Sequence, residues 1–94
     1  MVDELLKYVA DNHLEDVFHF NERKGIMPYE IEVIKYPNGN YAVMVNGNGD
    51  YGDVEAKYGI SEAEMCQICY KWLEFHNKLR NYDIVNGNVV FRKR

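Results

Sequence analysis

Side chains that catalyse reactions or cross-link a fold are scarce in this sequence. Its 94 residues include two cysteines, two prolines and one tryptophan, threonine is absent, and Ser61 is the only serine. No apolar run approaches the ~20 residues that a membrane-spanning helix requires. Asp3 and Glu4 stand where a signal peptide would carry basic and then apolar residues. We therefore expect a soluble, cytoplasmic protein with no membrane partner.

What the chain does contain is a composition typical of a folded domain. Hydrophobic residues make up 47% and aromatic residues 14%, which excludes a disordered or low-complexity chain. No linker or internal repeat divides the sequence. A length of 94 residues is enough for one core, so we expect a single domain over residues 1–94.

Residues 2–20 open with apolar positions three and four apart, the spacing of one helix face. These positions are Val2, Leu5, Leu6, Val9, His13 and Val17. Asp3 and Glu4 lie in the first turn, where the helix dipole favours negative charge. The pattern blurs after Asp11, so an extended segment over 17–20 is the alternative.

Residues 29–36 and 41–45 predict an antiparallel hairpin around Asn38-Gly39, the dipeptide preferred in type I′ turns. That turn pairs Tyr36 with Tyr41. It also pairs Ile34 with Val43 and Val33 with Met44, which leaves apolar residues on both faces. Residues 53–58 alternate between apolar and charged side chains and predict a third strand; a one-turn helix over the same residues is the alternative.

The clearest helix covers residues 61–80. Ser61 and Glu64 form a capping box. Apolar positions then span roughly 220° of the helix surface, more than the ~100° needed to cover one sheet. Either the first helix covers the excess, which favours a monomer, or a second copy or partner does. Asn86-Gly87 predicts a closing hairpin from residues 82–85 and 88–91. The fold class is therefore α+β.

Residue patterns that would suggest a metal or a cofactor are incomplete. Cys66 and Cys69 form a C-x-x-C motif, but they lie more than a turn inside the helix, on a face that we expect to be buried. Asn46, Asn48 and Asp50 resemble the first three ligands of a calcium loop, whose later glycine and glutamate are missing. We expect buried structural thiols, no metal and no cofactor.

A hydrolase needs a nucleophile, a base and an orienting acid within mutual reach. Ser61 is best explained as a helix cap, and no glycine-rich loop continues into the Lys-Ser/Thr of a phosphate-binding loop. We therefore expect no catalytic residues and no enzymatic activity.

The charges are unevenly distributed. Residues 1–64 hold 13 acids and 5 bases, whereas residues 65–94 hold 2 acids and 6 bases, within a net charge of −4. Acidic residues concentrate between positions 50 and 64, and Tyr51 and Tyr58 could add apolar contact area. The predicted partner-binding residues are Asp50, Tyr51, Asp53, Glu55, Tyr58, Glu62 and Glu64.

Residues 54–65 resemble the turn of helix-turn-helix proteins, with Gly59, Ile60, Ser61 and Met65 matching. The resemblance implies a short helix before the turn and a recognition helix after it. The basic C-terminal hairpin, ending in 92–94, would then be the wing of a winged-helix regulator of DNA. Glu62 and Glu64 would face DNA phosphates, so this function is the alternative.

The favoured hypothesis is a non-catalytic, acidic protein-binding module. Its partner would be a basic protein that handles nucleic acid, because an acidic surface can compete with nucleic acid for a basic groove. In general type the chain resembles phage-encoded inhibitors of host defence, including anti-CRISPR proteins. Direct DNA binding is expected to be absent under this hypothesis.

Overall fold

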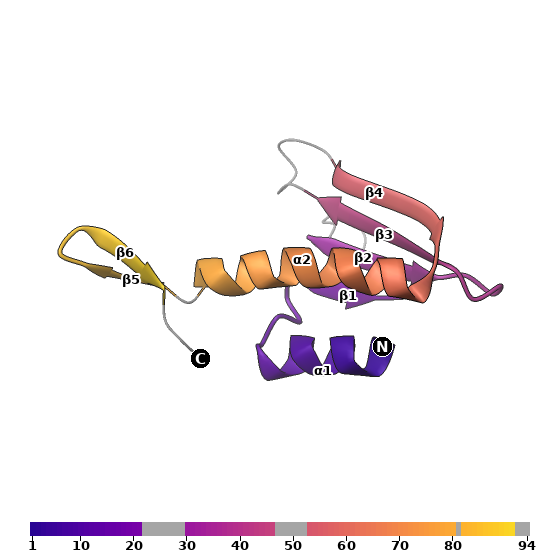
Figure 1. The fold of residues 1–94 in the computed structure, drawn as a ribbon, viewed down its shortest axis with the longest axis horizontal. Coiled ribbons are helices and arrows are strands. Elements are labelled where there is room, and N and C mark those ends of the chain that lie inside the picture. Colours follow the sequence, from indigo (N-terminus) through magenta and orange to yellow (C-terminus); the bar gives the residue numbers. More distant parts are fainter. Residues whose placement is uncertain (22–29, 47–52, 81, 92–94) are drawn as a thin grey trace.

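The computed structural model describes residues 1–21, 30–46, 53–80 and 82–91, and it has an α+β fold (Figure 1). In chain order the elements are α1 (Val2–Asp11), β1 (Phe18–Phe20), β2 (Ile31–Lys35), β3 (Tyr41–Asn46), β4 (Asp53–Ile60), α2 (Glu62–Arg80), β5 (Tyr82–Val85) and β6 (Asn88–Phe91). β1 to β4 form one sheet in chain order, with β1 parallel to β2 and the other pairs antiparallel. α2 lies across this sheet and α1 lies beside α2 (Figure 1).

The first helix ends at Asp11, earlier than its apolar pattern suggested, and the extended alternative for residues 17–20 is confirmed by β1. Asn12 stops the helix because its side-chain amide donates to the carbonyl of Tyr8 (2.9 Å). His13 then adopts a left-handed conformation with φ of 54°. The chain turns there, so that Leu14 enters the core although it lies off the helical stripe.

The turn between β2 and β3 differs from the predicted type I′ turn. The amide of Gly39 donates to the carbonyl of Tyr36 (3.0 Å), and the amide of Tyr36 donates to the carbonyl of Asn40 (2.8 Å). Gly39 has φ of +89°, and Asn38 has no positive φ. This is a three-residue loop, a type I turn followed by a glycine bulge. Pro37 explains it, because its fixed φ suits the first central position of a type I turn.

The longer loop shifts the strand register by one residue. Val33 pairs with Val43, Ile34 with Ala42, and Lys35 with Tyr41, so the predicted pairs were wrong. A shift of one residue moves side chains to opposite faces. The face toward the helices therefore carries four aliphatic residues that are at most 1% exposed: Ile31, Val33, Val43 and Val45. On the other face Glu32, Ile34 and Met44 are half-buried.

Gly39 supplies a first test of this hairpin. Replacing Gly39 with valine should lower the free energy of unfolding by about 1–3 kcal/mol, because a β-branched residue at positive φ is strained. Nothing lies within 4 Å of the added Cβ, so backbone strain is the only cost. Gly39→Asn is the control and should lose less, since asparagine tolerates this conformation. Thermal unfolding measures both, and an unchanged melting temperature for Gly39→Val would contradict the turn.

The predicted third strand is confirmed as β4, which pairs antiparallel with β3. The pairing contains two irregularities, and Gly59, the second-last residue of β4, has φ of +64°. Val45 pairs with Glu55 and Val43 with Lys57. Since paired residues share a face, these two polar residues of β4 lie on the helix side of the sheet, at its edge.

α2 begins at the predicted cap, because the amide of Glu64 donates to the Oγ of Ser61 (3.2 Å). α1 covers the side of α2 that carries Cys66 and Leu73, both buried. Ring contact between Tyr8 and Tyr70 (centroids 5.5 Å apart) joins the two helices. The side of α2 that faces away from α1 is less completely covered. Trp72 and Ile68 are only half-buried, and Phe75 is exposed.

The closing hairpin is confirmed with its predicted turn. Asn86 and Gly87 have φ of 51° and 79°, as a type I′ turn requires. β5 and β6 form a two-stranded sheet of their own, separate from β1–β4. The hairpin projects beyond the end of α2 (Figure 1).

Candidate interaction surface

The seven predicted partner-binding residues do not form one patch in the part of the chain that the structure describes. Asp50 and Tyr51 lie outside the described residues. Asp53 is placed as the first residue of β4, but its side chain is not among those described. Of the remaining four, Glu55 lies at the edge of the sheet. Tyr58, Glu62 and Glu64 lie at the corner where β4 meets α2.

Glu55 faces inward and contacts α2. One oxygen of its carboxylate accepts from the indole Nε1 of Trp72 (2.8 Å) and from the Nζ of Lys71 (2.9 Å). The hydrogen bond from Trp72, followed by that from Lys71, lowers the pKa of this carboxyl. Its side chain is 23% exposed. Glu55 therefore ties β4 to α2, a role that strand alternation could not reveal.

The other three residues lie near the start of α2. Tyr58 and Glu64 are exposed, and Glu62 accepts a hydrogen bond from the hydroxyl of Tyr41 (3.2 Å). Lys71, which holds Glu55, is nine residues further along the helix than Glu62. At a rise of ~1.5 Å per residue, Glu62 and the point on α2 where Lys71 contacts Glu55 are about 13 Å apart along the helix axis. Glu55 and Glu62 therefore do not belong to one cluster.

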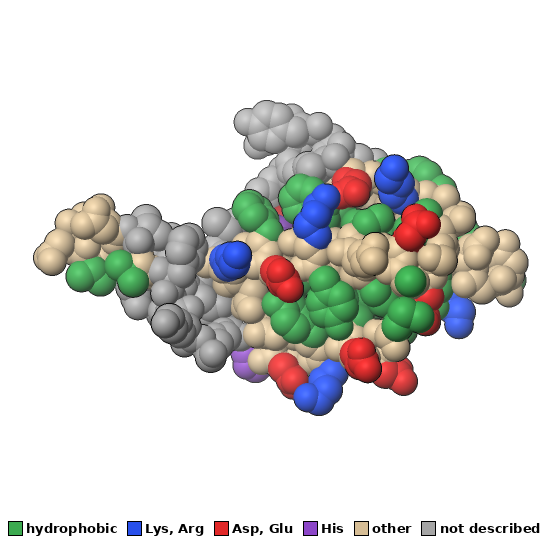
Figure 2. All heavy atoms as spheres, viewed as in Figure 1, with side chains coloured by type: hydrophobic (Ala, Val, Ile, Leu, Met, Phe, Trp, Pro, Cys, Tyr) green, Lys and Arg blue, Asp and Glu red, His purple; other side chains and the backbone are tan. Residues whose placement is uncertain are grey.

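The fold brings a further carboxylate to the start of α2. The pKa of the Cys66 thiol is raised by burial and then by Glu62, lowered by the N-terminal ammonium group and raised by Glu4, so two carboxylates and one positive charge act on this residue. The pKa of Tyr70 is raised chiefly by burial, with Cys66, Glu4 and Tyr8 among the lesser causes. We call Glu4, Tyr8, Glu62 and Tyr70 the acidic face. Over the two helices, Figure 2 shows hydrophobic side chains bordered by Asp and Glu side chains with some Lys or Arg side chains between them.

The predicted partner-binding residues did not include Glu4 and Tyr70, which belong to the acidic face. Glu4 was explained by the helix dipole and Tyr70 by the apolar arc of α2. A signal was present, because Glu4 and Tyr8 are four residues apart and so share one side of α1. Which side of α2 they meet depends on how the two helices pack.

The two cysteines are buried free thiols, in agreement with the sequence prediction of burial. Burial raises the pKa of Cys69 to about 12, and its Sγ lies 3.7 Å from the Sδ of Met65. At neutral pH both thiols are protonated and therefore poor nucleophiles. Among the described residues, no three His, Cys, Asp or Glu side chains are grouped closely enough to hold a metal ion.

The helix-turn-helix resemblance is not matched by the fold. Residues 53–60 form the strand β4, where that motif requires a short helix. Gly59 lies within this strand, and the segment before Ser61 pairs with β3 rather than packing on α2 as a first helix. The C-terminal hairpin is present, but residues 92–94 of the predicted wing lie outside the described residues.

Comparisons with protein-family models, with curated proteins and with solved structures find no match to this chain. No helix in the described part of the chain is long and apolar enough to cross a membrane.

Proposed function

We propose that this protein is a non-catalytic binding module that uses its acidic face to bind a basic protein. The observations that support this proposal are the carboxylate of Glu4, which acts on both Cys66 and Tyr70, the carboxylate of Glu62, which acts on Cys66, and the Tyr8–Tyr70 ring contact. Half-buried tyrosines supply apolar contact area with little side-chain freedom to lose, and aromatic residues are enriched at interface centres.

The charge of the face suggests the class of partner. Carboxylates attract a groove lined with lysine and arginine, and such grooves normally receive nucleic acid phosphates. Occupation of the groove by an acidic protein would exclude the nucleic acid. The proposed function is therefore inhibition of a nucleic-acid-handling protein, of the kind that phage inhibitors of host defence perform.

The protonated, buried thiols support a function without catalysis. Cys66 and Cys69 are among the most reactive residue types of the chain, yet the fold encloses both between α2, α1 and the sheet. Their raised pKa values keep them neutral at physiological pH. We propose that their role is to fill the core, as small apolar side chains do.

The double variant Glu4→Lys/Glu62→Gln tests the acidic face. A glutamine in place of Glu62 keeps an acceptor for the hydroxyl of Tyr41, so the fold is preserved while two negative charges are lost and one positive charge is gained. A pull-down from host lysate supplies the basic partner, and we expect its association rate with the variant to be roughly tenfold or more lower at low salt, with a flatter salt dependence. Stopped-flow mixing of the purified pair at low and high salt measures both.

Glu64→Lys tests the corner where β4 meets α2 separately from the acidic face. Position 64 lies about 160° around α2 from Cys66, at ~100° per residue, so it is on the other side of the helix. Sensitivity to Glu64 but not to Glu4 would move the interface to that corner. Unchanged association for all variants would contradict the proposal. A gel shift that shows salt-sensitive binding to duplex DNA would instead support the DNA-binding alternative.

A further inference from the structure

The C-terminal hairpin exposes apolar side chains that no other element of the described chain covers. Ile84, Val85 and Val90 are 68%, 49% and 48% exposed. Within the described ranges, the strands β5 and β6 pair only with each other, outside the main sheet. An isolated two-stranded hairpin is at best marginally stable in water, so this one needs a surface to pack against.

The helices and main sheet of the same molecule are poorly placed to provide that surface. A single residue separates Arg80, the last residue of α2, from Tyr82, the first residue of β5. A reversal of chain direction takes about four residues, so a connection of one residue carries the hairpin onward from the helix. In Figure 1 it extends away from both helices and from the main sheet. Short connections of this kind favour exchange between two copies.

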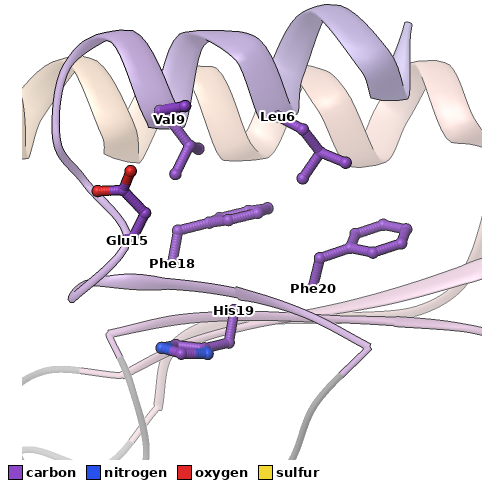
Figure 3. A pocket seen from close by; sticks show the side chains of 7 residues that line it. Leu6, Val9, Glu15, Phe18, His19 and Phe20 are labelled. Atoms are coloured by element: carbon purple, nitrogen blue, oxygen red, sulfur yellow. The ribbon is translucent and has the colours of Figure 1, made fainter.

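A receptor of suitable chemistry lies between α1 and β1. A cleft of about 300 Å³ there is bordered by Leu6 and Val9 of α1 and by Phe18 and Phe20 of β1. Figure 3 shows both phenylalanines directed toward α1, while His19 points to the other side of the strand. Leu6 is 37% exposed, so part of this apolar lining faces solvent.

Among the residues that the structure describes, the cleft adjoins an edge of the main sheet that no further strand covers. β1 is the end strand of the order β1-β2-β3-β4, and its one neighbour in that sheet is β2. An edge strand presents backbone N–H and C=O groups that another strand can pair with. An incoming strand at this edge would lie beside β1, and its side chains would reach the cleft between β1 and α1.

The residues that follow the hairpin in the sequence carry charge opposite to that of the cleft. The segment from α1 to β1 contains five acids and one base: Asp3, Glu4, Asp11, Glu15 and Asp16 against Lys7. Glu15 lines the cleft itself (Figure 3). The hairpin contains one acid, Asp83, and is followed in the sequence by three bases, residues 92–94. Attraction between unlike charges would therefore guide the hairpin of one molecule toward the cleft of another.

We propose that this protein forms a two-fold dimer in which the β5–β6 hairpin of each copy docks into the α1–β1 cleft of the other. One strand of the hairpin extends the main sheet at the open edge of β1, the mode of recognition called β-augmentation. The exchange is reciprocal, so both hairpins and both clefts are occupied and the assembly closes at two copies. The sequence favoured a monomer because α1 covers α2, and the dimer surface proposed here lies elsewhere.

Sedimentation equilibrium on the full chain tests the dimer. Leu6→Arg alters the cleft and Ile84→Asp alters the hairpin; both side chains are exposed in the single chain, so circular dichroism should show unchanged folds. Each variant should raise the dimer dissociation constant by about 10- to 100-fold, the effect of removing a buried aliphatic contact. Phe75→Asp changes an equally exposed apolar residue outside both surfaces and should leave the constant unchanged.

Mixing the two variants provides the sharper test. Leu6→Arg retains an intact hairpin and Ile84→Asp retains an intact cleft, so a 1:1 mixture has one complete contact. We expect each variant alone to sediment as a monomer at concentrations where the mixture contains a heterodimer. A wild-type chain that stays monomeric at all concentrations would overturn the proposal. So would a dimer that withstands both variants, or one that is lost with Phe75→Asp.

Discussion

Replacing Leu5 with alanine is expected to lower the free energy of unfolding by about 2–5 kcal/mol, the usual cost of deleting a fully buried leucine side chain. Leu5 is 0% exposed and belongs to the core that α1 shares with α2 and the sheet. A small domain has only about 5–15 kcal/mol of stability. The loss corresponds to a fall in melting temperature of at least about 8 °C, taking 4–8 °C per kcal/mol for a chain of this size.

Leu6→Ala is the matched control, because Leu6 is the next residue of the same helix and is 37% exposed. It removes the same atoms with the same change in helix propensity, and we expect it to cost less than about 1.5 kcal/mol. Urea unfolding of both variants, at concentrations where the chain is monomeric, gives the comparison. Equal losses at the two positions would mean that α1 does not pack on the core through Leu5.

The contact of Glu55 with α2 predicts the second large effect. Glu55→Ala removes the carboxylate that accepts from Trp72 and Lys71, and we expect a loss of about 1.5–3 kcal/mol, the range for hydrogen bonds to a charged group. The chain has one tryptophan, so its fluorescence reports on this contact directly. Glu74→Ala, at an exposed position of α2, is the control and should change stability by less than about 0.5 kcal/mol.

The same contact should depend on pH. The pKa of Glu55 is lower in the folded chain because Trp72 and Lys71 hydrogen-bond its charged form. Its contribution is therefore present above the unfolded pKa of ~4.3 and is lost as the pH falls through the lower folded value. Glu55→Gln should show a smaller loss of stability across this acidic range than the wild type. Identical pH profiles would contradict the contact.

Local signals in the sequence account for much of the fold. The Ser61–Glu64 box placed the start of α2, and Asn86-Gly87 specified a type I′ turn, because both are read from neighbouring residues. The turn at Asn38-Gly39 followed Pro37 instead. Proline has a fixed negative φ, so the turn began one residue earlier and gained a bulge. The information was present, but the Asn-Gly preference was given more weight.

Neighbouring residues could not specify which surfaces meet. Alternation showed that Glu55 and Ala56 face opposite sides of β4, but only the packing of α2 on the sheet edge turned Glu55 into a partner of Trp72. Glu4 and Glu62 are 58 positions apart, and the docking of α1 on α2 brings them to one face. Periodicity fixes which residues share a side of an element. The surface that this side meets depends on the free energy of packing segments that are distant in the chain.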